Sequence, residues 1–378
     1  MARTTDYSSI AWGNPEKTGA AFDFRSDVVT TPSRATLAAI ACATLNDDVY
    51  NEDTTTAEFE NDMAARCGHE AAAFVITGTM ANQLALRSLL YQPPHSILTD
   101  AHSHIIHWEA GAASFLSGAA IQAVRPVNGR HLTLDDIRKH AIWTDDVHKC
   151  PTRVISLENT TSGNIIPLSD MRMIKAWADD RGILVHLDGA RLWEAVGTGA
   201  GTLRDFAQCA HLTTLDFSKN LAAPMGAMVV GSRRAITALK RIRKGLGGGM
   251  RQAGILAAAA RQSVFEHFGG GIVCTQPHLI KSHLMAQRVA QAWTNRGGRL
   301  LRDAETNMVW LDLNASAVDI NSWNSIGKKH GIMLNGKRVV THHQLCEAAF
   351  SLLDVVMDEA LDLVRYGSNE ERVRKTKL

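Results

Sequence analysis

Short apolar runs of strand length alternate with segments of helical spacing through the central part of the chain. The apolar runs are "AAAFVIT", "SILTD", "AIQAVRPV", "TRVISLE", "ILVHLDGA", "LTTLDFS" and "AMVVGS". Helical spacing follows in "MANQLALRSLLY", in "LSDMRMIKAWADDRG", and in "LTLDDIRKHA", where Thr133 and Asp136 predict a capping box. Strands that alternate with helices in this way indicate an α/β domain with a mostly parallel sheet wrapped by helices.

The pattern changes after about Gly247. "GGGMRQAGILAAAARQSVFEHF" is a glycine-rich loop followed by a helix of small residues. From about residue 275 onward, strand-like runs ("NMVWLDL", "RVVTH") alternate with longer helical segments, as in a smaller α+β unit. We therefore expect an N-terminal arm over 1–32, a large α/β domain over 33–265 and a small C-terminal α+β domain over 266–378.

Polar residues follow several of the predicted strands at the point where each strand ends. These segments are "TGT" at 77–79, "DAHSH" at 100–104, "DGAR" at 188–191 and "SK" at 218–219. In open α/β sheets, ligands bind at the carboxyl ends of the strands. One polar strand end is an ordinary loop, but several together predict a site.

Composition adds limits on what the protein binds. The chain has 378 residues, 45% hydrophobic and 21% charged, with a formal net charge of +2. That charge is too close to neutral to favour nucleic acid or an anionic membrane as a partner. The basic segment 233–245 is typical of a solvated helix face, although one of its cations could meet a phosphate. No apolar run is long enough to cross a bilayer.

The six cysteines are scattered, and none forms a CxxC pair or a metal-binding spacing. We therefore expect reduced thiols, no metal site and a cytoplasmic protein. The N-terminal "MARTTDYSSIAWGNPEKTG" is polar, without an apolar signal-peptide core. The final Thr-Lys-Leu weakly resembles a peroxisomal address.

Lys219 has two interpretations. A lysine after a strand is usually a solvated surface charge, but a partly desolvated amine can form a Schiff base. Asp188 could cap a helix or pair with an arginine, or it could face a protonated ring nitrogen. Arg191 could form a simple ion pair or offer a bidentate contact to a substrate carboxylate. His104 is either an ordinary polar loop residue or a ring lying over a cofactor.

Gly78 and Thr79 stand between a strand and a helix, where backbone N–H groups and a hydroxyl can hold a phosphate. Alone this is a weak signal. An imine-forming lysine, an acid for a pyridinium nitrogen and a phosphate site are together what pyridoxal phosphate requires. The set therefore predicts this cofactor.

The motifs also resemble a known family in their order along the chain. They are "FDFRSDVVTTPS", "DDVYNED", "VITGTMANQLAL", "DAHSHIIHWEAGA", "LENTTSGNIIPL", "HLDGARLWEA", "FSKNLAAPMGA" and "GGGMRQAGILAA". From about Phe22 to Arg338 the sequence is similar to the low-specificity L-threonine aldolases, which are fold-type I pyridoxal-phosphate enzymes of the β-eliminating lyase group. The resemblance implies a homo-oligomer, usually a dimer of dimers, that acts on a small amino acid.

The resemblance also implies roles for individual residues. Lys219 would form the Schiff base, Asp188 would face the pyridine nitrogen and His104 would stack on the ring. Gly78 and Thr79 would hold the phosphate, with Arg243 supplied by a neighbouring subunit. The substrate residues would be Ser26, Arg191, Arg338 and Thr161, with Tyr50 from the neighbouring subunit.

Two stretches depart from the family pattern. Where many members have histidine or asparagine after "LENT", this chain has Thr161 and Ser162, and a hydroxyl is a poor base at neutral pH. The stretch after the lysine is usually glycine-rich, but here it contains Asn220 and Ala222. Both changes fit either neutral drift or a change of reaction.

Two reactions therefore stay open. The first, which family membership favours, is retro-aldol cleavage of L-threonine or L-allo-threonine to glycine and an aldehyde. The second is racemisation of alanine, since some fungal alanine racemases resemble threonine aldolases. A racemase needs a proton donor opposite Lys219, and His104, His107 or a held water could serve. A non-catalytic descendant of the fold is less well supported, because Lys219 and Asp188 are both present. A sulfur lyase is a third option, as is an aminotransferase, which would need a keto-acid partner to which nothing in the sequence points.

Overall fold

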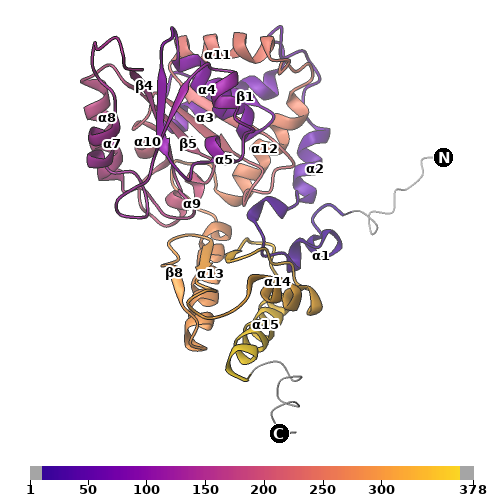
Figure 1. The fold of residues 1–378 in the computed structure, drawn as a ribbon. Coiled ribbons are helices and arrows are strands. Elements are labelled where there is room, and N and C mark those ends of the chain that lie inside the picture. Colours follow the sequence, from indigo (N-terminus) through magenta and orange to yellow (C-terminus); the bar gives the residue numbers. More distant parts are fainter. Residues whose placement is uncertain (1–10, 367–378) are drawn as a thin grey trace, which may run out of the picture. The chain divides into compact units, whose positions relative to one another are not determined.

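The computed structural model describes residues 11–366, and these form two compact units. The large unit is Arg34–Gln276. The small unit combines both ends of the chain, Met1–Ser33 and Pro277–Leu378. Figure 1 shows the elements of both units along the chain.

The large unit is built on a seven-stranded sheet in the order β1-β7-β6-β5-β4-β2-β3. Its strands are β1 (Ala71–Val75), β2 (Ser96–Asp100), β3 (Ala120–Val124), β4 (Thr152–Glu158), β5 (Leu184–Gly189), β6 (Leu212–Asp216) and β7 (Ala227–Gly231). β7 runs antiparallel to both β1 and β6, whereas the strands from β6 to β3 are parallel. The predicted mostly parallel α/β sheet is confirmed.

Helices cover the sheet of the large unit (Figure 1). They are α2 (Arg34–Ala41), α3 (Thr54–Cys67), α4 (Gly78–Leu89), α5 (His104–His107), α6 (Ala112–Phe115), α7 (Leu134–His140), α8 (Leu168–Asp179), α9 (Leu192–Gly197), α10 (Leu203–Ala207), α11 (Arg233–Gly245) and α12 (Gly254–His267). The predicted capping box at Thr133 and Asp136 begins α7.

Alternation along β1 explains how helices are held on both faces. Ala73 and Val75 are fully buried in a core with residues of α4 and α11. Phe74 points to the opposite face, where its ring stacks on Phe217 and lies 6.2 Å from Phe59 of α3, centroid to centroid. Successive side chains of a strand face opposite sides of the sheet, so a strand of this kind must be apolar throughout.

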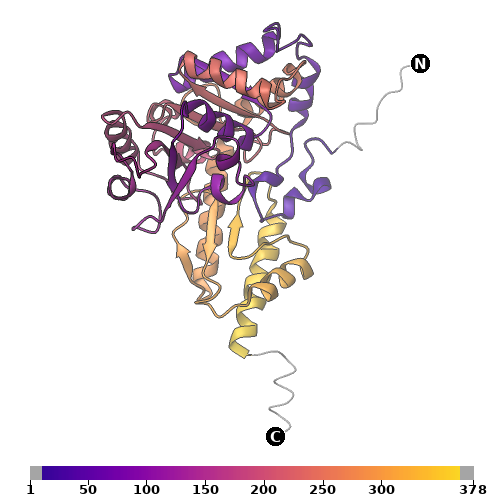
Figure 2. The same cartoon turned by 45° about the horizontal axis from the view of Figure 1, so that its top comes forward.

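The small unit has a three-stranded antiparallel sheet in the order β10-β9-β8. Its elements are α1 (Pro15–Thr18), the 3₁₀ turns η2 (Ala20–Phe22) and η3 (Asp27–Val29), α13 (Pro277–Asn295), β8 (Leu300–Arg302), β9 (Met308–Leu311), α14 (Ile320–Lys329), β10 (Arg338–Val340) and α15 (Glu347–Tyr366). α13 packs on β9, and α14 packs on α15 (Figure 2). Trp293 and Trp323 meet edge to face in this core.

The units divide the chain differently from the domains expected from sequence. The expected boundary at 265/266 falls inside α12, a helix that packs on α2 and α3 and so belongs wholly to the large unit. The N-terminal arm expected over 1–32 is not a separate element in its described part, residues 11–32. Phe24 N–H donates to the carbonyl of Met333, and Met333 N–H donates to the carbonyl of Phe22. Segments far apart in sequence thus join in one unit.

The C-terminal Thr-Lys-Leu lies outside the described residues. Within residues 11–366, none of the helices combines the length and the apolar character needed to cross a membrane.

Candidate active site

The parallel strands end in acidic residues along one edge of the large sheet. Glu158 is the last residue of β4, Asp188 is the penultimate residue of β5 and Asp216 is the last residue of β6. Glu158 and Asp188 stand opposite each other in register. Lys219 follows β6 by three residues, so the sheet brings Asp188 and Lys219 to the same edge, as the strand pattern predicted.

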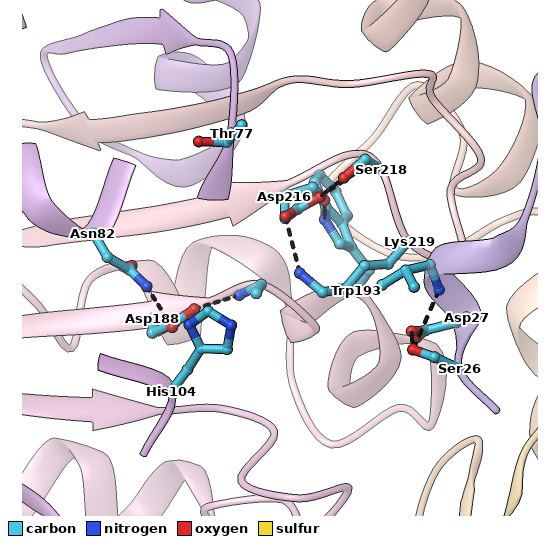
Figure 3. Close-up of polar contacts among 12 residues, drawn as sticks. Ser26, Asp27, Thr77, Asn82, His104, Asp188, Trp193, Asp216, Ser218 and Lys219 are labelled. Carbon is cyan, nitrogen blue, oxygen red and sulfur yellow. Dashed lines mark hydrogen bonds and ion pairs between the residues drawn. The ribbon is translucent and has the colours of Figure 1, made fainter. Parts of the chain in front are cut away.

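Asp188 is held in a fixed orientation. It is 4% exposed, and one of its carboxylate oxygens accepts a hydrogen bond from Asn82 Nδ2 at 2.7 Å. The other oxygen accepts from the backbone N–H of Ala190 at 3.0 Å. Asn82 lies on α4, so this helix fixes the carboxylate predicted to face a pyridine nitrogen (Figure 3).

Glu109 connects Asp188 to His104. Its Oε1 accepts from Asn82 Nδ2 at 2.9 Å and pairs with His104 Nδ1 at 2.7 Å, while Oε2 accepts from Gln83. The Glu109 side chain is completely buried and the His104 side chain is 43% exposed. Because Asn82 Nδ2 faces two carboxylates, its amide cannot flip without placing its oxygen against them.

His104 is predisposed to carry a proton. Its hydrogen bond to Glu109 raises the pKa of the imidazole, against the opposing effect of burial, and the nearby Asp188 adds to the rise. The backbone N–H of His104 donates to Glu158 at 2.9 Å. Burial, with the negative charge of Asp188 as a second cause, raises the pKa of Glu158 to about 7. Both raised pKa values favour the protonated forms of His104 and Glu158.

Glu109→Gln is expected to lower the pKa of His104, because glutamine carries no charge to stabilise the imidazolium. The measurement is a ¹H–¹⁵N NMR titration of the histidine rings. Asp170→Asn is a matched control, since Asp170 faces His131 at 3.2 Å and does not contact His104. An unchanged His104 titration in Glu109→Gln would contradict the role given to Glu109.

Lys219 forms an ion pair rather than extending into solvent. Its Nζ lies 2.9 Å from Asp216 Oδ2, and its side chain is 17% exposed. The other oxygen of Asp216 accepts from the backbone N–H and the hydroxyl of Ser218 (Figure 3). The interpretation of Lys219 as a solvated surface charge is therefore wrong.

Gly78 begins α4, and Thr77 caps this helix by accepting from Met80 N–H at 3.1 Å. A Cβ atom on Gly78 would lie only 2.7 Å from Asp216 Oδ2, so a side chain here would displace that carboxylate. Thr79 is exposed in the first turn. The helix N-terminus is suited to an anion, as predicted for phosphate, although Asp216 places a negative charge beside it.

Arg243 is buried, unlike several of its basic neighbours on α11. It is 5% exposed, and its guanidinium donates to the carbonyl of Phe74 at 2.6 Å and to Asp48 at 3.0 Å. These contacts fix Arg243 inside its own large unit. Its role at the phosphate of a neighbouring subunit stays a prediction. The sequence pattern missed its burial because it cannot distinguish a buried arginine from its exposed neighbours on α11.

The two departures from the family pattern have local structural functions. The hydroxyl of Thr161 donates to the backbone carbonyl of Glu158, and Thr161 pairs with Asn164 through the backbone. Asn220 is 3% exposed and donates to Glu194 at 2.9 Å. Ala222 has a φ of 59°, a left-handed conformation that favours glycine. This backbone conformation explains why glycine is common at this turn in the family.

The remaining predicted residues lie in different settings. Arg191 precedes α9 and lines a small cavity with Lys219 and Asp216. Tyr50 is 69% exposed, with the Arg251 guanidinium 5.9 Å from its ring centroid. Ser26 and Arg338 belong to the small unit, where Ser26 caps η3 and Arg338 donates to the carbonyl of Arg25. Their contacts with substrate stay predictions.

The donor set fits pyridoxal phosphate. An amine, a buried carboxylate held by hydrogen bonds and a helix N-terminus are supplied by Lys219, Asp188 and α4 within one unit. Among residues 11–366, His104, Glu109 and Asp188 place atoms that could bind a metal ion within 4.8 Å of one another. Both carboxylates already accept hydrogen bonds from Asn82, and Glu109 also pairs with His104, so this group is explained by hydrogen bonding.

Several site residues were missed from the sequence. Asn82, Glu109 and Glu158 lie inside the quoted motifs and Asp216 lies in the apolar run "LTTLDFS"; the available signal was an acidic residue at the end of a strand, which applies to Glu158 and Asp216. They were missed because residue type alone does not show which polar side chains are buried or which partners they contact in the fold.

Comparison with known proteins identifies the family. The model of the β-eliminating lyase family matches residues 23–316. The chain belongs to the β-eliminating lyase family. The predicted resemblance is thereby confirmed, and membership of this family implies an enzyme that uses pyridoxal phosphate.

The relatives found by comparison are named either as an alanine racemase or as aldolases. The chain is 49% identical to alanine racemase TOXG of Cochliobolus carbonum, covering 93% of this chain and 90% of that protein. It is 46% identical to aldolase vrtJ of Penicillium aethiopicum, with 90% and 87% covered. It is 38% identical to the low-specificity L-threonine aldolase of Eremothecium gossypii, with 94% and 91% covered.

Solved structures of the family support the fold. The threonine aldolase of Leishmania major matches with a TM-score of 0.73 over 90% of this chain and 99% of that one, at 17% identity. The fold-type I architecture expected from the resemblance is confirmed.

Proposed function

We propose that this enzyme cleaves β-hydroxy-α-amino acids such as L-threonine and L-allo-threonine into glycine and an aldehyde, with pyridoxal phosphate attached to Lys219. The observation that carries the proposal is the pairing of His104 with the buried Glu109, connected through Asn82 to Asp188. This arrangement puts a proton-transfer group beside the carboxylate expected to face the cofactor. The names of the relatives at 46% and 38% identity support it.

Pyridoxal phosphate would supply an electron sink for the bond broken at Cα of the substrate. Asp188 would stabilise positive charge at the pyridine nitrogen, because both of its oxygens are already oriented by hydrogen bonds. The first turn of α4 would hold the phosphate through backbone N–H groups. Arg191 would bind the substrate carboxylate with its planar guanidinium.

Retro-aldol cleavage also needs a base for the proton of the β-hydroxyl. Nδ1 of His104 is bound to Glu109, so Nε2 is the nitrogen that remains for a substrate. Thr161 is unsuited to this task because its hydroxyl donates to the carbonyl of Glu158. The neutral form of His104, with its Nδ1 proton donated to Glu109 and Nε2 unprotonated, is therefore the proposed base, and the raised pKa makes this form a stronger base.

Alanine racemisation is the second candidate, and specific observations favour it. The relative named alanine racemase is 49% identical over most of the chain. The raised pKa of His104 suits a group that donates a proton, which racemisation requires on the face opposite Lys219. Alanine has no hydroxyl, so the engaged hydroxyl of Thr161 would not matter.

Two parallel assays separate the candidates. Incubation with L-threonine and with L-allo-threonine is expected to release acetaldehyde, measured by coupled reduction. Incubation with L-alanine in D₂O, followed by chiral chromatography, measures D-alanine. Acetaldehyde without D-alanine supports the aldolase, and D-alanine without acetaldehyde replaces it with the racemase. Neither product would contradict both assignments.

A further inference from the structure

Asp216 is a rigidly placed carboxylate that the proposed chemistry does not yet use. As the last residue of β6 it is paired in register with Ala227 of β7. Its backbone carbonyl accepts from Trp193 Nε1 at 2.9 Å. It is 5% exposed, and both of its carboxylate oxygens are engaged, one by Ser218 and one by Lys219 (Figure 3). Because Asp216 is fixed in this way, its carboxylate can determine the position of the charged Nζ atom of Lys219.

The carboxylate lies between Lys219 and the start of α4. The 2.7 Å approach of Asp216 Oδ2 to the position of a Gly78 Cβ shows that no side chain separates Asp216 from the helix N-terminus. A side chain placed only for stability would not need to face both the proposed Schiff-base lysine and the proposed phosphate site.

Other charged side chains lie near Asp216 and Lys219, and several of them have hydrogen-bond partners of their own. Arg191 and Glu194 line the same small cavity as Asp216 and Lys219, and Glu194 accepts a hydrogen bond from Asn220. Asp188, on the next strand, is bound by Asn82 and by the backbone of Ala190. α4 offers no charged side chain in its first turn, only its N–H groups. Asp216 is the carboxylate in direct contact with Lys219 Nζ at 2.9 Å.

We propose that Asp216 is a positioning residue that directs the Nζ atom of Lys219 and, once the cofactor is attached, favours a proton on that atom. This inference rests on the proposed function. When Lys219 is linked to the cofactor aldehyde, the protonated linkage would carry positive charge, and the nearby carboxylate of Asp216 would stabilise that charge. The carboxylate thereby favours the protonated linkage, which is the form that a substrate amine attacks.

The test is the visible spectrum of the holoenzyme as a function of pH. The protonated linkage absorbs near ~420 nm, and loss of its proton moves the band to shorter wavelength. Asp216→Asn keeps the shape but removes the charge, so the band is expected to be lost at a pH lower by at least about one unit. Asp216→Glu restores the charge and is expected to shift the transition back toward that of the wild type.

Two further variants keep the proposal testable. Asp179→Asn removes a carboxylate that pairs with Lys175 on the surface, and it is expected to leave the spectrum unchanged. Ser218→Ala removes one donor from Asp216 but keeps the ion pair, so the band should persist to the same or a higher pH. An earlier loss of the band in Ser218→Ala would contradict the proposal even if Asp216→Asn did not fold.

The outcomes separate this inference from the proposed function. A wild-type holoenzyme whose ~420 nm band titrates identically in Asp216→Asn overturns the role of Asp216 and leaves the proposed function intact. A wild-type protein that binds pyridoxal phosphate without any such band overturns the proposed function as well, because Lys219 would then not be linked to the cofactor.

Discussion

Lys219→Ala is expected to abolish both the yellow colour of the enzyme and its turnover, with kcat lowered by at least about 10⁴-fold. Lys219 is the lysine at the carboxyl edge of the sheet that shares this edge with Asp188. Alanine cannot form the covalent link or move a proton at that position. The absorption spectrum and the rate of product formation are both measured on purified protein.

A matched control tests whether the loss belongs to this lysine alone. Lys175 also pairs with a carboxylate, Asp179, but lies on α8. Lys175→Ala is expected to retain the cofactor band and nearly full activity. A Lys219→Ala protein that keeps a cofactor band reducible by borohydride would show that another amine holds the cofactor.

Asp188→Asn is expected to lower kcat by at least about 10²-fold with a smaller effect on KM. The substitution keeps the shape of the side chain but removes the charge that would stabilise a protonated pyridine nitrogen. Because Asp188 would act on the cofactor and not on the substrate, the loss should fall on the chemical step. Steady-state kinetics with the substrate identified by the paired assays provide both constants.

The control for Asp188→Asn addresses folding. The variant should fold and retain cofactor binding, but with a lower melting temperature, because the single amide oxygen of asparagine can accept from only one of the two donors, Asn82 Nδ2 or the backbone N–H of Ala190. A folded variant with wild-type kcat would contradict the role of Asp188.

The strands of the large unit were predictable because their signal is local. Buried runs such as 71–75 and 227–231 are apolar throughout and are followed within two residues by polar ones. Their order in space and the antiparallel direction of β7 depend on pairing between distant segments, which no local pattern contains. The same reason explains why the joining of 20–29 with the C-terminal part was missed.

The sequence was enough to propose Lys219, Asp188 and His104 as site residues, but not to find the side chains that hold them by hydrogen bonds. Lys219, Asp188 and His104 stand at strand ends, where chemistry is expected, and the family resemblance gave them roles. Glu109 and Asp216 are recognisable only from their contacts, since a buried carboxylate can be identified as a partner only when its donors are known. Residue type likewise did not show that Arg243 is held inside its own unit.

The most direct test of the central claim is to identify the residue that carries the cofactor. Holoenzyme is reduced with borohydride, digested and mapped by mass spectrometry. A phosphopyridoxyl group on the peptide that contains Lys219, and its absence from peptides containing other lysines, is the result predicted. A reduced adduct on a different lysine, or none on Lys219 in protein that binds pyridoxal phosphate, would contradict it.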